Sequence, residues 1–186
     1  MAVHSTVVKF TYDDYLLFPD DGRRHELIDG DHYMTPSPSE RHQRVAMNLS
    51  GALWRYLVTR SIGRVYAAPF DVVLSTIDVV QPDLFFVSSA KASIVTNRNI
   101  RGAPDLVVEI LSEVTRKTDE IVKRKLYERF DVPEYWIIDP EIETIKIYRM
   151  TAQGYHRIAE LNCEADDALS TPILPDLTIQ LKDIFA

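Results

Sequence analysis

Two long stretches of the chain carry apolar residues at the spacing of an amphipathic helix. The first covers residues 39–60, where Ser39 is the expected N-cap. Its expected core positions recur every three or four residues: Val45, Leu49, Leu53, Trp54 and Leu57. The second is expected at 118–130, with Thr118 as N-cap and a core-facing stripe at Val122, Leu126 and Phe130. A shorter helix is expected at 11–18, behind Thr11.

Apolar runs separated by turn residues predict strands around these helices. Asp29-Gly30 marks a hairpin turn inside "HELIDGDHYMTPSP". Further strands are expected at 64–75, 79–88, 104–112, 133–140, 143–150 and 154–161. The segment 89–102 is polar and predicts a loop with a helical turn, and the tail at 175–186 predicts a strand or short helix. This order favours one α/β domain over residues 1–186, with a mixed central β-sheet flanked by helices.

Composition narrows the class of protein. Hydrophobic residues make up 46% and charged residues 26% of the chain, which is typical of a globular protein. No apolar run reaches the roughly 18 residues of a membrane span, and "MAVHSTVVKFTYDDYL" lacks the features of a secretory signal. Cys163 is the one cysteine, so we expect a cytoplasmic protein without disulfides. The net charge of -7 argues against a general nucleic-acid coat, although a metal-dependent nuclease remains compatible with it.

A carboxylate lies inside the most apolar strand. Glu109 in "PDLVVEILS" should be buried, and burying a charge costs several kcal/mol unless it is compensated. Asp105 shares its strand face but lies about 13 Å away, so it is expected only to cap the strand start. Asp83 in "VVQPDLFFV" is a better partner, because Pro82 interrupts the pairing of its strand. Two carboxylates at such a break predict a site for Mg²⁺, with Mn²⁺ as a substitute.

The second long helix offers a compensating amine. Lys123 lies about 60° from the centre of the core-facing stripe and Lys125 about 100° away on the other side, so Lys123 is better placed to reach inward. Asp119, Lys123 and Tyr127 follow one another at four-residue spacing on one line of the helix. A lysine beside two carboxylates and a metal ion can orient a water molecule and stabilise charge on a phosphate.

These segments resemble a known family. "HELIDG", "PSERH", "VVQPDLFFV", "APDLVVEILSEVTRKTDEIVKRKLY" and "DVPEYWIIDP" are similar, in this order, to a large bacterial family of restriction-endonuclease-like proteins in the PD-(D/E)XK nuclease superfamily. The resemblance implies a restriction-endonuclease-like core, DNA as substrate, Mg²⁺ as cofactor and a homodimer. It also implies that Asp83 and Glu109 are the two motif acids and that Glu26 is an additional metal ligand. Leu111 stands where the motif lysine would be, and Lys123 matches the lysine that the family supplies from the next helix.

Each of these residues also has a structural interpretation. Glu109 and Lys123 could form a structural salt bridge, and Asp83 could simply end a strand. Glu26 could pair with a neighbouring arginine, Arg23 or Arg24, at the surface. His42 is interpreted mainly as a residue in packing or a local hydrogen bond rather than a substrate contact. Tyr135 and Trp136 are interpreted mainly as core or dimer-contact aromatics rather than base-stacking groups.

Three functions remain open at this stage. The first is a Mg²⁺-dependent endonuclease that hydrolyses DNA phosphodiester bonds, with Asp83, Glu109 and Glu26 as metal ligands and Lys123 as the catalytic amine. The second is a catalytically inactive module of the same fold that binds nucleic acid or a protein partner. The third is a metal-dependent hydrolase acting on another phosphate ester. No phosphate-cradling glycine-rich loop or zinc signature is present in the sequence.

Overall fold

The computed structural model describes residues 8–186, so the first seven residues of the N-terminal stretch interpreted above lie outside it. The helical elements are α1 (Tyr12–Tyr15), α2 (Glu40–Leu57), η1 (Ser89–Ile94), η2 (Thr118–Lys123), α3 (Arg124–Arg129), η3 (Cys163–Ala165) and α4 (Leu181–Phe185). The first seven strands are β1 (Arg24–Ile28), β2 (Asp31–Thr35), β3 (Gly63–Ala67), β4 (Asp71–Val73), β5 (Val79–Val80), β6 (Leu84–Ser88) and β7 (Asn99–Arg101). The remaining strands are β8 (Leu106–Ile110), β9 (Glu134–Asp139), β10 (Thr144–Thr151), β11 (Gly154–Asn162), β12 (Ala168–Thr171) and β13 (Leu174–Gln180).

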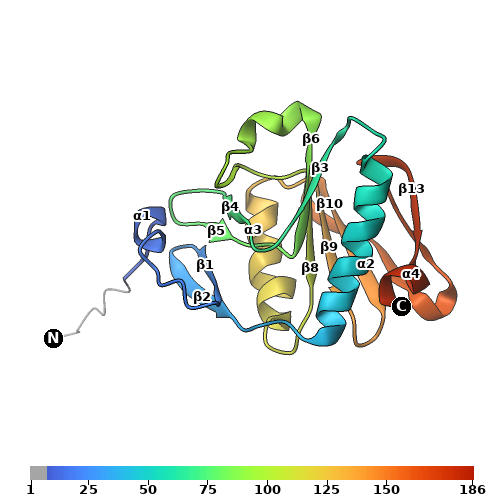
Figure 1. Ribbon diagram of the computed structural model, residues 1–186, viewed down its shortest axis with the longest axis horizontal. Helices are drawn as coiled ribbons and strands as arrows, with labels where there is room; N and C mark the ends of the chain where they lie inside the picture. The colour runs from blue at the N-terminus through green and yellow to red at the C-terminus, as the bar shows by residue number, and fades with distance from the viewer. Residues whose placement is uncertain (1–7) are drawn as a thin grey trace.

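A mixed six-stranded sheet forms the centre of the fold. Its order is β11-β10-β9-β8-β6-β3, and the pairing is antiparallel except between β8 and β9. A second sheet has the order β2-β1-β5-β4-β7, with β4 and β7 parallel, and β12 pairs with β13. Helix α2 packs on one face of the six-stranded sheet and α3 on the other (Figure 1). The predicted α/β class, a mixed sheet flanked by helices, is therefore confirmed.

Strand β8 is buried on both faces, as its apolar sequence predicts. Leu106, Val108 and Ile110 pack into the core beneath α2, whereas Val107 packs into the core beneath α3. Because side chains alternate along a strand, Glu109 lies on the same face as Val107 and is directed toward the second long helix.

Several predicted elements are confirmed. Ser39 accepts a hydrogen bond from the amide of His42 and caps α2, and Thr11 caps α1. The hairpin turn is built on positive φ angles at Asp29 and Gly30, as the turn type requires. The expected core position at Trp54 is wrong, because its side chain is 63% exposed and lines a surface cavity beside β3.

Other boundaries differ from the prediction. The strand expected at 64–75 is two strands, β3 and β4, and the strand expected at 79–88 is divided into β5 and β6 at Gln81–Asp83. The expected loop at 89–102 contains β7, which is too short for a periodic pattern. The second long helix begins near Arg116, where the Ser112 hydroxyl accepts a hydrogen bond from the Thr115 amide, so Thr118 is not its cap. Within residues 8–186, no helix is both long and apolar enough to cross a membrane.

Candidate active site

A cavity of about 400 Å³ opens where β6 begins and β8 ends. Its walls come from β1, the first turn of α2 with the loop before it, the segment just before β6, the end of β8 with the loop that follows, and the helix η2. Five of the residues that line it are charged side chains that are almost fully buried: Glu26, Asp83, Glu109, Asp119 and Lys123. The structure therefore brings all four sequence-predicted site residues to one cavity, together with Asp119.

Lys123 lies between the acids and compensates Glu109. Its Nζ is 2.9 Å from Oε1 of Glu26, 3.0 Å from Oε1 of Glu109 and 3.6 Å from Oδ1 of Asp119. The segment that carries Asp119 and Lys123 is a π-helix, an uncommon geometry that is frequent at functional sites. Lys125 is exposed on α3, so the sequence prediction that Lys123 is the inward-facing lysine is confirmed in its geometry.

Glu109 is held by two donors from the same helix. Oε1 accepts hydrogen bonds from Lys123 Nζ and, at 2.7 Å, from the Tyr127 hydroxyl. Burial raises the pKa of Glu109 well above its usual range, and Asp119, Asp83 and Glu26 add to this, while Lys123 opposes them. Burial likewise raises the pKa of Asp119 to about 6, against the opposing charge of Lys123. Glu109 and Asp119 therefore bind a proton more readily than ordinary carboxylates do.

Asp83 has the opposite electrostatic environment. Its Oδ1 accepts a hydrogen bond from Arg24 Nη1 at 2.6 Å. Its Oδ2 is 3.0 Å from His42 Nε2 and accepts a hydrogen bond from the Ile110 amide at 2.9 Å. Burial acts to raise the pKa of Asp83, but His42 and Arg24 outweigh it and lower that pKa to about 2. Asp83 is therefore a fixed carboxylate beside two readily protonated ones.

The strand register explains why Asp83 and Glu109 share the cavity. Leu84 pairs with Val108 across β6 and β8, so one step further along the antiparallel ladder Asp83 comes beside Glu109. The bond from the Ile110 amide to Asp83 confirms this proximity. The break in pairing at Pro82 is thus where the two acids meet, as the sequence predicts.

Glu26 is buried, and the alternative that it pairs with Arg23 or Arg24 at the surface is wrong. Its Oε1 also accepts a hydrogen bond from the Gln81 amide at 2.8 Å, which links β1 to the break between β5 and β6. The contacts of Glu26 and Glu109 described here all fall on Oε1, so Oε2 of each carboxylate remains for another partner.

Four residues complete the site without having been assigned to it from the sequence: Arg24, His42, Asp119 and Tyr127. For Asp119 and Tyr127, the sequence signal was their four-residue spacing from Lys123 along the helix. Nothing in the sequence pattern joins Arg24 or His42 to Asp83, because these contacts bridge 59 and 41 positions of the chain. Asp105 is structural, as expected, since it accepts a hydrogen bond from the Ser88 amide and pairs with Lys91.

The donor atoms fit a hard divalent cation by their chemistry. Carboxylate oxygens are the ligands that Mg²⁺ and Mn²⁺ prefer. Four carboxylates (Glu26, Asp83, Glu109 and Asp119) face two permanent cations, Lys123 and Arg24, which leaves a formal imbalance of two negative charges. Within residues 8–186, however, no three His, Cys, Asp or Glu groups are already spaced to ligate one metal ion. The residue types therefore fit such an ion, whereas a finished ligand cage is not preformed.

Comparisons with known proteins agree with this architecture. The sequence model of the Uma2 family, described as "Putative restriction endonuclease", matches residues 12–182. A crystal structure of a "putative nuclease belonging to DUF820" from Anabaena variabilis ATCC 29413 is similar in fold. Its TM-score is 0.79 at 21% sequence identity, over 95% of this chain and 97% of that chain. No match was found among curated proteins. With the family match spanning nearly all of the chain, the protein belongs to the Uma2 family of restriction-endonuclease-like proteins.

Proposed function

We propose that the protein is a metal-dependent endonuclease that hydrolyses DNA phosphodiester bonds, with Mg²⁺ as cofactor and Mn²⁺ as a substitute. The observation that carries the proposal is the gathering of four buried carboxylates and one buried lysine around a single cavity. Membership of a family described as "Putative restriction endonuclease" supports the same class of reaction. A purely structural core would gain little from such a group, because buried ion pairs are often no more stable than apolar residues of similar size.

In this proposal Asp83, Glu109 and Glu26 hold the metal ion. When bound, it would polarise a phosphoryl oxygen and lower the pKa of a coordinated water. Lys123 keeps its ammonium at the acids, because Glu109 and Glu26 raise its pKa well above the usual range despite its burial. It can therefore donate hydrogen bonds to an attacking water or to the charge that develops on the phosphate.

The partners of Asp83 have a positioning role in the proposal. His42, Arg24 and the Ile110 amide fix the Asp83 carboxylate from three directions. Arg24 is the most accessible of these groups, with a side chain 24% exposed at the cavity. If both strands of a duplex are cut, we propose that two copies of the chain act together, which sedimentation in solution tests.

Cleavage of plasmid and linear duplex DNA tests the proposal. Wild-type protein should cut with Mg²⁺ or Mn²⁺ and not with excess chelator. Asp83→Asn, Glu109→Gln and Lys123→Gln should each reduce the rate by about 100-fold or more, the size expected for loss of a preorganised charge at the reaction centre. Lys125→Gln, on the exposed side of α3, is the matched control and should cut normally. Full activity in the Glu109→Gln and Asp83→Asn variants would refute the site.

One observation favours a second candidate, the inactive binding module. Lys123 already satisfies Glu26 and Glu109 directly, so the group can exist as a closed salt-bridge network. Thermal unfolding with added Mg²⁺ or Mn²⁺ separates the two functions, because an ion that binds the native state raises its stability. No shift with either ion, together with retained DNA binding, would favour the inactive module.

A further inference from the structure

The arginines of the chain are unevenly distributed. Residues 41–70 contain five arginines and no aspartate or glutamate, whereas the whole chain has a net charge of -7. The five are Arg41, Arg44, Arg55, Arg60 and Arg64. The remainder of the chain therefore carries a formal charge of -12. This segment forms α2, the connection that follows it and the edge strand β3.

Three of these arginines lack an acidic partner. Arg41 pairs with Glu141 and Glu143, and Arg44 with Glu40. The other three, Arg55, Arg60 and Arg64, are exposed and form no ion pair with any described residue. Arg60 instead packs over the ring of Tyr56, with its guanidinium carbon 4.2 Å from the ring centroid. Their charge is thus available to a ligand.

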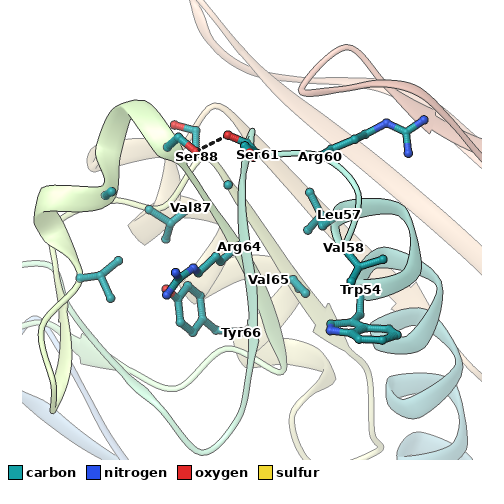
Figure 2. Close-up of a pocket in the computed structure, with 14 residues that line it drawn as sticks. Trp54, Leu57, Val58, Arg60, Ser61, Arg64, Val65, Tyr66, Val87 and Ser88 are labelled. Atoms are coloured by element: carbon teal, nitrogen blue, oxygen red, sulfur yellow. Dashed lines mark hydrogen bonds between the residues drawn. The ribbon is translucent and has the colours of Figure 1, made fainter.

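Large apolar side chains lie near these arginines, on the flank of α2 that borders β3. Met47, Trp54 and Val58 are 70%, 63% and 59% exposed. A cavity of about 760 Å³ begins beside Trp54 and extends around β3 to η1. Figure 2 shows Trp54 and Val58 on one side of β3 and Arg64 with Tyr66 on the other. We name Trp54, Val58, Arg55, Arg60 and Arg64 the basic α2–β3 surface.

The charge of this surface distinguishes its two plausible occupants. A second copy bound about a two-fold axis would place the same patch against itself. The unpaired arginines of both copies would then meet, which costs free energy. A nucleic acid presents closely spaced phosphates to arginine and π-faces to an exposed tryptophan. Charge complementarity therefore favours the nucleic acid.

We propose that the basic α2–β3 surface binds the phosphate backbone of the nucleic acid that enters the candidate active site. This inference rests on the proposed function and adds the path of the substrate. His42, at the start of α2, contacts Asp83 in the cavity, so the helix runs from the candidate site to the basic α2–β3 surface. From His42 to Arg55 the helix rises about 20 Å, which corresponds to about six phosphates of one strand.

The test measures binding separately from cleavage. A fluorescent duplex of about 20 base pairs is titrated with Glu109→Gln protein over a range of salt concentrations. Adding Arg55→Gln, Arg60→Gln and Arg64→Gln together should weaken binding at least tenfold. It should also reduce the slope of log affinity against log salt by about two to three, since each phosphate contact contributes about 0.9. The matched control replaces three exposed cations outside the segment, Arg98, Lys125 and Arg157, and should bind as the parent does.

The two tryptophans provide a second readout. Trp136 is fully buried and Trp54 exposed, so acrylamide quenching of wild-type fluorescence reports mainly on Trp54. Duplex DNA should protect Trp54 from acrylamide, and the protection should disappear in Trp54→Phe. Unchanged affinity, slope and quenching, in a protein that does bind DNA, would overturn the inference while leaving the proposed function intact. A dimer that Trp54→Ala dissociates, with normal DNA binding, would assign the surface to self-association instead. Absence of both DNA binding and cleavage in the wild type would defeat the proposed function as well.

Discussion

Replacing Lys123 by methionine removes the cation that pairs with three of the buried acids. Methionine is similar in length and apolar, so it keeps the packing while deleting the charge. Three buried acids would lose the ammonium that lies within 3.6 Å of them: Glu26, Glu109 and Asp119. Removing one partner of a buried ion pair typically costs about 3–5 kcal/mol, because the other charge stays buried and unpaired. We expect Lys123→Met to lose about that much unfolding free energy near neutral pH.

The stability lost in Lys123→Met should depend on pH. Burial raises the pKa of Glu109 well above its usual range and that of Asp119 to about 6, and in both cases Lys123 opposes the rise. Without the lysine, both pKa values should rise further. A carboxyl whose folded pKa exceeds its unfolded pKa takes up protons in the native state, so stability increases as the pH falls through that range. The loss in Lys123→Met should therefore be largest above about pH 7 and shrink toward about pH 5.

Urea unfolding of wild type and Lys123→Met at about pH 5 and about pH 8 measures this difference. Lys125→Met is the matched control, because Lys125 is exposed two residues away, and it should stay within about 0.5 kcal/mol of wild type. A loss below about 1 kcal/mol at the higher pH, or an equal loss at both, would show that the acids are not charged around Lys123 as inferred.

Three further predictions concern one of the acids and two partners of the others. Asp119→Asn should raise the unfolding free energy near pH 7 by about 2–3 kcal/mol. The pKa of Asp119 is raised from 3.8 to about 6, and each unit penalises the charged native carboxylate by about 1.4 kcal/mol. A destabilised variant in urea unfolding would contradict this prediction. Tyr127→Phe should cost about 1.5–3 kcal/mol, because Glu109 loses a 2.7 Å donor, and chemical unfolding above about pH 7 measures the loss. Arg24→Gln should move acid unfolding to higher pH. Ionised Asp83 confers stability that is present above about pH 3.8 and lost as the pH falls through about 2, and a weaker partner shifts that loss to higher pH. An unchanged acid midpoint in circular dichroism would argue against this role of Arg24.

Much of the site could be read from local sequence. Glu109 stands out because a charged residue interrupts a buried strand, and Pro82 marks the break where Asp83 meets it. The helical line through Lys123 and Tyr127 predicts which lysine turns inward. These signals are local, since they depend on the period of one strand or one helix.

Long-range contacts could not be read in the same way. Arg24 and His42 reach Asp83 from β1 and α2, and no periodic pattern links them to it. Trp54 fits a core position by spacing alone, yet the structure exposes it among unpaired arginines. A hydrophobic pattern does not distinguish a residue that packs inside the chain from one that faces a ligand. The prediction of Thr118 as N-cap is wrong, because the helix starts earlier, directly after the hydrogen bonds between Ser112 and Thr115.

The central claim is that the buried acids form a cation site, and calorimetric titration with Mn²⁺ tests it most directly. Burial holds the pKa of Glu109 well above its usual range, and a metal ligand must be deprotonated, so binding at Glu109 should release protons. Titrations in two buffers of different ionisation enthalpy count those protons. We predict Mn²⁺ binding with proton release in the wild type, and binding that is weaker by about tenfold or more with less proton release in Glu109→Gln. Absence of Mn²⁺ binding to the wild type, or equal binding and proton release in Glu109→Gln, would contradict the account.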